Sequence, residues 1–172
     1  MKKLFNYFYN KQEIAILVPF LLLILFFYSR NEAMLDPKTI SSILRTIAFP
    51  ALISMGMVQL MIAGEIDLST AAVMSFCAVL SAKLIKDFNF DVSEAVIIAL
   101  LFSLLIGFVN AILTVKIGIF SVIATIGTGF VVRGSSYMFT NGVPIYPMPE
   151  SFAFLGSMRP LNISFTFFLM LA

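Results

Sequence analysis

The chain alternates between long uncharged apolar segments and short polar segments that contain its charged residues. A helix needs about 20 predominantly apolar residues to cross the roughly 30 Å hydrocarbon core of a bilayer. Five segments approach or reach that length, and a sixth is still apolar where the sequence ends. In chain order they are residues 14–28, 43–63, 68–85, 92–115 and 117–139, and the segment that starts near Leu161. The pattern predicts an all-α integral membrane protein, a polytopic helix bundle of about five complete transmembrane helices and the start of a sixth.

The composition supports a membrane protein and excludes several other classes. Hydrophobic residues make up 60% of the 172 residues and charged residues 12%, which is far from the balance of soluble domains. A net charge of +2 from scattered basic residues gives no nucleic-acid surface. With one cysteine, Cys77, and no histidine, the chain lacks the residues of zinc sites, disulfides and Cys/His nucleophiles. We therefore expect no catalytic residue and no metal site.

The two ends of the chain raise separate questions. Lys2, Lys3 and Lys11 precede the first apolar segment, as basic residues precede a signal peptide, but a polar loop without a small-residue cleavage site follows it. The apolar segment after Leu161 ends at Ala172, short of a full crossing, so we interpret the chain as a fragment. Basic residues flank the segments on both sides, so the positive-inside rule does not decide the orientation.

The turn GEIDLS, residues 64–69, places two carboxylates between strongly apolar segments. Gly64 can end one helix, and Asp67 or Ser69 can accept hydrogen bonds from the free N–H groups that start the next. Capping alone explains these residue types. The alternative is functional, because ionisable residues within a membrane usually face a pathway or a partner.

Three further polar side chains interrupt the apolar segments: Gln59, Asn110 and Arg133. The two carboxamides need hydrogen-bond partners, so we expect them to face protein or water, either as contacts between helices or along a pathway. Arg133 would either anchor the end of its helix or line a pathway, with Thr140 and Asn141 as polar neighbours.

Small residues within the segments predict close helix packing. Gly107 and Ala111 form a small-xxx-small pair, and Gly127 with Gly129 would let another backbone approach the fifth helix.

The segment 140–160 is the richest in residues that oppose a regular helix. Gly142, Pro144, Pro147 and Pro149 lie in it, and Tyr146 adds an aromatic side chain suited to the membrane interface. We expect this segment to be a loop that contacts the interface or a partner protein.

Two stretches of the chain resemble the ribose-type permeases, the transmembrane subunits of bacterial ATP-binding-cassette importers for simple sugars. IAGEIDLSTAAVMSFCAVLSA is similar to that family's pattern at the start of a span. IATIGTGFVVRGSSYMFTNGVPI is similar to its Thr-x-Gly-Thr, Arg-Gly and Gly-x-Pro-Ile pattern, which here includes Arg133-Gly134 and Gly142. Glu65 departs from the family, which typically has a second glycine there, and Thr70-Ala71-Ala72 replaces its usual Val-Gly-Ser.

The resemblance implies that residues 1–172 are the N-terminal part of a single transmembrane permease domain, with residues 1–13 in the cytoplasm and residues 140–160 as an extracytoplasmic loop. It implies a multi-pass protein of the bacterial cytoplasmic (inner) membrane, surrounded by lipid, that moves a simple sugar by alternating access. The expected partners are a second permease subunit, identical or different, a cytoplasmic ATPase, and a periplasmic or lipid-anchored sugar-binding protein. The chain itself has no phosphate-binding glycine loop, so ATP would be used by the partner and no cofactor is expected here.

Two other classes remain open at this point: a fragment of an ion-coupled secondary transporter, and a membrane assembly subunit that does not transport. An ion-coupled carrier would need carboxylates deep within its spans, and the predicted spans lack them outside the GEID turn.

Overall fold

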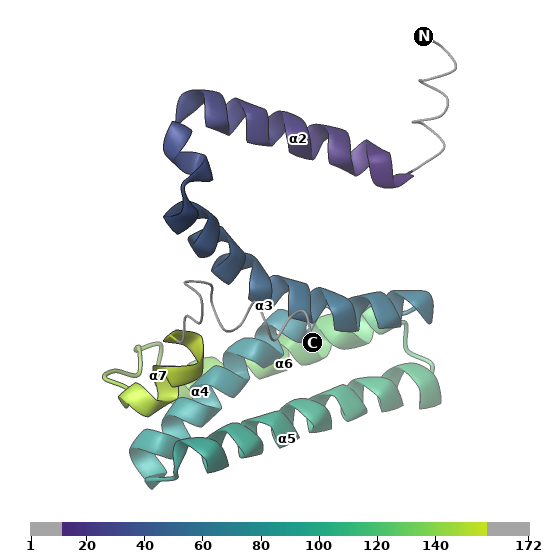
Figure 1. The fold of residues 1–172 in the computed structure, drawn as a ribbon. Helices are drawn as coiled ribbons and strands as arrows, with labels where there is room; N and C mark the ends of the chain where they lie inside the picture. Colours follow the sequence, from purple (N-terminus) through teal and green to yellow (C-terminus); the bar gives the residue numbers. More distant parts are fainter. Residues whose placement is uncertain (1–11, 158–172) are drawn as a thin grey trace.

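The computed structural model describes residues 12–157, and all regular elements in that range are helical. The α-helices are α2 (Gln12–Arg30), α3 (Pro37–Ile62), α4 (Thr70–Phe88), α5 (Val92–Ala111), α6 (Ser121–Thr140) and α7 (Glu150–Ser157). A short 3₁₀-helix, η1 (Glu32–Leu35), joins α2 to α3, and a π-helix, η2 (Ile112–Lys116), continues α5 (Figure 1). The described part of the chain is therefore all-α, as the apolar pattern predicts.

Each of the first five predicted apolar segments corresponds to one helix, and two of these helices start about four or more residues from the predicted position. The second helix starts at Pro37 rather than at residue 43, because the fixed φ of proline suits the first turn of a helix. The fifth starts at Ser121 rather than at residue 117, because Gly118 has a φ of +83° and ends the preceding helical segment. The predicted start of a sixth helix near Leu161 and most of the segment 1–13 lie outside the described residues.

Two of the described helices are long and apolar enough to be candidate membrane spans. They are Pro37–Ile62, with 26 residues, and Val92–Lys116, with 25 residues, which combines α5 with the π-helix. A shorter apolar helix covers Ile16–Arg30. Helices α4 and α6 have 19 and 20 residues, and their sequences contain more polar and small side chains.

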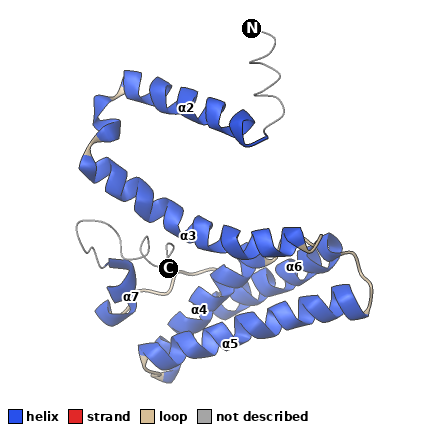
Figure 2. Ribbon diagram, turned by 45° about the vertical axis from the view of Figure 1, so that its right-hand side comes forward, coloured by secondary structure: helices blue, strands red, loops and turns tan. Residues whose placement is uncertain are grey.

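Helices α4, α5 and α6 pack together, with contacts from α4 to both of the others (Figure 1). Ala72 and Phe76 of α4 and Val132 of α6 form the buried core of this unit. The ring of Phe76 lies 6.3 Å from that of Phe102 and 6.0 Å from that of Phe139, centroid to centroid, so one aromatic side chain of α4 contacts α5 and α6. Helix α2 and the first part of α3 extend away from the unit (Figures 1 and 2).

The unit has two ends, which we name by their connections. The turn end contains residues 63–69 and 112–120, and a hydrogen bond from the amide of Ile66 to Oγ of Ser121 joins these segments. The loop end contains residues 89–91 and 141–149, and Nζ of Lys86 donates to the carbonyl of Tyr146 at 2.8 Å.

Prolines shape two of these elements. Pro50 lies inside α3, and α3 changes direction along its length, as proline within a helix favours (Figures 1 and 2). The predicted loop 140–160 is not entirely non-helical, because α7 begins at Glu150, directly after Pro149. Pro149 ends the irregular stretch because a proline before the first turn of a helix costs no hydrogen bond.

Candidate functional site

Between Gly64 and the start of α4, the chain runs in a non-helical conformation alongside the first turns of α6. Oγ of Ser121 accepts a hydrogen bond of 3.3 Å from the amide of Ile66, and Oγ1 of Thr125 accepts one of 3.1 Å from the amide of Leu68. Two side chains of α6 thus satisfy backbone groups that have no helical partner. Such pairing is what permits irregular backbone among apolar helices.

Gly129 continues this contact one turn further along α6. A Cβ atom at Gly129 would lie 3.5 Å from Cα of Ser69 and 3.8 Å from its Cβ, so the two backbones approach closely here. Ser121, Thr125 and Gly129 are each four residues apart and therefore share one face of α6. The segment 64–69 packs on this face. The first residue of α4 therefore lies beside the third turn of α6 and not beside Ser121, the first residue of α6.

Asp67 organises the start of α4 through its side chain. Its Oδ1 accepts a hydrogen bond of 2.7 Å from the amide of Ser69 and one of 2.6 Å from Oγ of Ser69. The expectation that Asp67 or Ser69 accepts a free N–H at the start of α4 holds for Asp67, which accepts from the amide of the N-cap residue Ser69, whereas the side chain of Ser69 makes no capping bond. A bond from the carboxylate to the amide two residues later is the local pattern that Asp favours in turns.

Asn110 of α5 contacts the same serine from the opposite side. Its side chain is only 5% exposed, and Nδ2 donates to Oγ of Ser69 at 3.0 Å. Oδ1 of Asn110 is buried without a hydrogen-bond partner among the described residues. Asp67, Ser69 and Asn110 therefore form a partly buried polar cluster that joins the segment 64–69 to α5, and one of its acceptors is unpaired.

The π-helix begins two residues after Asn110. The amide of Ile117 donates to the carbonyl of Ile112 at 3.0 Å, the i to i+5 bond of a π-helix, and the hydroxyl of Thr114 donates to the carbonyl of Asn110. π-Helical turns inside α-helices are frequent at functional sites. Asp67 and Ser69 of the polar cluster thus lie in irregular backbone, the segment 64–69, and Asn110 lies two residues before the irregular backbone of η2.

A second polar feature is a groove of about 450 Å³ between α4 and α6, toward the loop end. Arg133, Ser136, Tyr137 and Thr140 of α6 line it, together with residues of α4 and residues 142–145. Gly142 has a φ of +73°, and a Cβ atom there would lie 2.8 Å from Oη of Tyr137. The left-handed backbone conformation favours glycine at this position, and the exposed ring of Tyr137 lies close to it.

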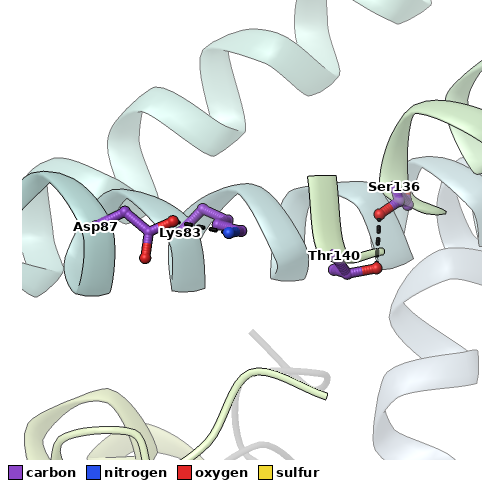
Figure 3. Close-up of polar contacts among 4 residues, drawn as sticks. All are labelled: Lys83, Asp87, Ser136 and Thr140. Carbon is purple, nitrogen blue, oxygen red and sulfur yellow. Dashed lines mark hydrogen bonds and ion pairs between the residues drawn. The ribbon is translucent and has the colours of Figure 1, made fainter. Parts of the chain in front are cut away.

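The hydroxyl groups of the groove already donate to the backbone of α6. Ser136 donates to the carbonyl of Val132 at 3.1 Å, and Thr140 donates to the carbonyl of Ser136 at 3.0 Å. Figure 3 shows the Thr140 bond near the C-terminal part of α4, where Lys83 and Asp87 form an ion pair of 2.7 Å. Oγ1 of Thr140 also accepts from the amide of Gly142 at 3.2 Å, so one lone pair of Thr140 and those of Ser136 remain as acceptors for a ligand.

Several residues singled out from the sequence lie outside both features. Gln59 is exposed, so the expected contact with the bundle is not found within residues 12–157. A Cβ atom at Gly107, Gly127 or Gly134 would meet nothing within 4 Å, so the packing expected at Gly107 and Gly127 is also not found there.

Two other residues from the sequence analysis lie at helix ends, where their backbone has a positive φ. Gly64 follows α3 with a φ of +82°, in keeping with a glycine that ends a helix, and Asn141 ends α6 with a φ of +52°. Among the described residues, no group of three or more Cys, Asp and Glu side chains could hold a metal ion.

Ser121 and Thr125 are functional candidates that the sequence analysis did not identify. They lie 55 and 57 residues from their partners, so no local pattern indicates the contact. The available signal was their spacing, since Ser121, Thr125 and Gly129 place small residues on one helical face.

Comparison with known proteins shows the family of the chain. The family model described as "Branched-chain amino acid transport system / permease component" matches residues 39–172. The xylose/arabinose import permease protein XylH of Sulfolobus acidocaldarius is 32% identical over 126 residues, which cover 70% of this chain and 35% of that protein. The autoinducer 2 import system permease protein LsrC of Escherichia coli O157:H7 is 28% identical over 155 residues, which cover 90% and 45%.

The ribose import permease protein RbsC of Bacillus subtilis is 31% identical over 124 residues, which cover 72% of this chain and 38% of that protein. The chain thus spans less than half the length of these relatives. No solved structure matches the chain. The resemblance to ribose-type permeases is confirmed, and a permease component is a transport component rather than an enzyme. On the match over residues 39–172, the chain belongs to the family of permease components described for branched-chain amino acid transport systems.

Proposed function

We propose that this chain is the N-terminal part of the permease subunit of an ATP-binding-cassette importer that moves a simple sugar, such as a pentose, a hexose or a related furanosyl compound, across the bacterial cytoplasmic membrane. The observation that supports the substrate class is the set of relatives, whose names state import of xylose and arabinose, of ribose, and of autoinducer 2. Transport would proceed by alternating access in a pair of permease subunits.

A membrane topology of five crossings by α2 to α6 is consistent with the contacts of the fold. With a cytoplasmic N-terminus, five crossings assign the turn end to the cytoplasmic side and the loop end, with residues 140–160, to the extracytoplasmic side. This assignment requires residues 63–69 to share a side with residues 112–120. The bond between Ile66 and Ser121 supports that requirement.

The polar cluster of Asp67, Ser69 and Asn110 is our candidate for coupling transport to the ATPase. Its support is physical: an acidic side chain and a buried unpaired acceptor lie among apolar helices, where polar groups are retained for pathways and partners. Irregular backbone on both sides of the cluster would allow it to change shape without unfolding a helix. The partners are a cytoplasmic ATPase, which uses the ATP, and a periplasmic or lipid-anchored sugar-binding protein.

Reconstitution of the full-length permease with its ATPase and binding protein tests this proposal. We expect ATP-dependent uptake of at least one of D-ribose, D-xylose and L-arabinose into proteoliposomes, and no uptake when the ATPase is omitted. Uptake that persists without the ATPase and follows an imposed ion gradient would instead identify a secondary transporter. Assembly of the complex without uptake of any tested solute would favour a subunit that does not transport.

A further inference from the structure

The groove between α4 and α6 contains the positive charge of Arg133, an exposed residue of α6 that would lie within the membrane in the proposed five-crossing topology. Arg133 is the thirteenth of the 20 residues of α6, so its Cα lies about 10 Å along the helix from the end at Thr140. Its guanidinium forms no ion pair with any residue of the described range 12–157. A charged side chain at such a depth usually faces protein or a water-filled cavity rather than lipid.

The groove offers hydrogen-bond donors and acceptors together. Arg133 supplies five N–H donors and is the one charged residue among those that line the groove within the described chain. Ser136 and Thr140 direct their hydroxyl hydrogens to carbonyls of α6, and Oγ1 of Thr140 also accepts from the amide of Gly142 at 3.2 Å, so each oxygen keeps at least one lone pair for a further donor. A phosphate or carboxylate would meet these lone pairs unfavourably, whereas a hydroxyl group can accept from Arg133 and donate to Ser136 or Thr140.

Contacts at the loop end stabilise the shape of the groove. Residues 142–145 form one of its walls, and a hydrogen bond of 3.2 Å from the amide of Gly142 to Oγ1 of Thr140 fixes the start of that wall. Lys86 of α4 fixes the next part of the segment through its bond to the carbonyl of Tyr146. Tyr137 is itself 70% exposed and presents an aromatic ring to the groove, a surface on which the C–H groups of a sugar ring can pack.

We propose that this groove is the extracytoplasmic part of the substrate path and that Arg133, Ser136, Thr140 and Tyr137 bind the hydroxyl groups and ring of a neutral polyol. This inference rests on the proposed importer function and names where, and by which side chains, the sugar is bound. The guanidinium of Arg133 is the main donor, and the two hydroxyl oxygens are acceptors.

Thiol labelling tests whether the groove is open to water from the extracytoplasmic side. In the full-length permease complex without other cysteines, Cys77 included, Ser75→Cys places a thiol in the groove about 20 Å along α4 from its end at Phe88. Ser103→Cys on α5 is the matched control, because Ser103 does not line the groove and lies about 17 Å from the start of α5 at Val92. We expect a membrane-impermeant sulfonated maleimide, added outside, to label Ser75→Cys at least about tenfold faster.

Uptake measurements test the role of Arg133. Arg133→Gln is expected to lower uptake of the transported sugar about tenfold or more, as loss of a hydrogen bond from a charged group predicts, with membrane abundance unchanged. Arg133→Lys should retain part of the activity because it keeps the charge and some donors. Ser135→Ala is the control, since Ser135 lies beside the groove residues but does not line the groove.

Three results would overturn the proposal. They are equal labelling of the two thiols, wild-type uptake by Arg133→Gln, and a fall in abundance that accounts for the loss of uptake, which would make Arg133 a structural residue. Failure of the importer function can be distinguished from failure of the groove proposal. In the first case wild-type complexes would take up none of the sugars, whereas labelling of the groove does not depend on transport.

Discussion

At the scale of single residues, the polar cluster is organised around Ser69. This serine is 1% exposed, it donates to Asp67, and it accepts from Asn110, so both hydrogen-bonding capacities of its hydroxyl are used. Asp67 bonds within its own segment, whereas Asn110 connects that segment to another helix. The two residues should therefore respond differently to substitution.

Replacement of Asn110 by leucine should lower the thermal stability of the protein in detergent. The substitution removes the hydrogen bond from Nδ2 of Asn110 to Oγ of Ser69, which joins α5 to the segment 64–69. Polar contacts between membrane helices contribute about 0.6 to 2 kcal/mol to stability. Gln59→Leu is the matched control, because that carboxamide is exposed and its loss should leave the melting temperature nearly unchanged. A melting temperature of Asn110→Leu that equals or exceeds the wild-type value would show that the bond contributes nothing.

Replacement of Asp67 by asparagine separates geometry from charge. Asparagine keeps an oxygen that can accept from the amide of Ser69, so folding and membrane abundance should change little. If the charge contributes to coupling, as we propose, sugar uptake and ATP hydrolysis by the complex should become uncoupled or fall.

Glu65→Gly is the control for this substitution, because the ribose-type pattern that this turn resembles implies glycine at that place, and we expect the change to be tolerated. Full coupled transport by Asp67→Asn would reject a role for the charge, and a parallel loss of abundance would make Asp67 structural.

At the scale of elements, the apolar pattern predicted the helices but not the contacts that form the site. The first five helices were predictable because each is an apolar run of near-spanning length bounded by polar residues. The π-helix was not, because nothing in the sequence ILTVK of Ile112–Lys116 distinguishes it from a further turn of the α-helix it continues. The contact of the segment 64–69 with α6 depends on residues more than 50 positions apart, which a local pattern cannot specify.

The close approach at Gly129 gives a prediction for α6. Gly129→Leu should destabilise the protein by about 1 to 3 kcal/mol, because the side chain would enter the space occupied by Ser69 and Leu68. Gly129→Ala should be tolerated, since its Cβ would make ordinary contacts of 3.5 Å or more. Gly127→Leu is the matched control on an exposed face of the same helix. Unfolding in detergent measures all three, and equal stability of the two leucine variants would contradict the contact.

At the scale of the whole molecule, the described part of the chain leaves much apolar surface without a protein partner. Side chains along α2 and α5, among them Leu22, Leu25, Leu101 and Leu104, are more than half exposed. Lipid can cover such surfaces, and so can the remainder of a permease, because this chain spans less than half the length of its relatives. The groove at Arg133 adds a few polar side chains to this apolar surface.

Expression of residues 1–172 alone should separate membrane insertion from transport. The apolar helices should direct the chain into membranes, because two of them satisfy the length and hydropathy of spans without help from other segments. Even with the ATPase and the binding protein present, the chain should not support ATP-dependent uptake, since the relatives it matches contain more than twice as much sequence as the matched part. Resistance to carbonate extraction measures insertion, and uptake of radiolabelled D-ribose, D-xylose and L-arabinose into vesicles measures transport, with the full-length permease as the positive control. Robust uptake by this chain in vesicles that lack the ATPase would contradict the importer proposal and indicate an independent carrier.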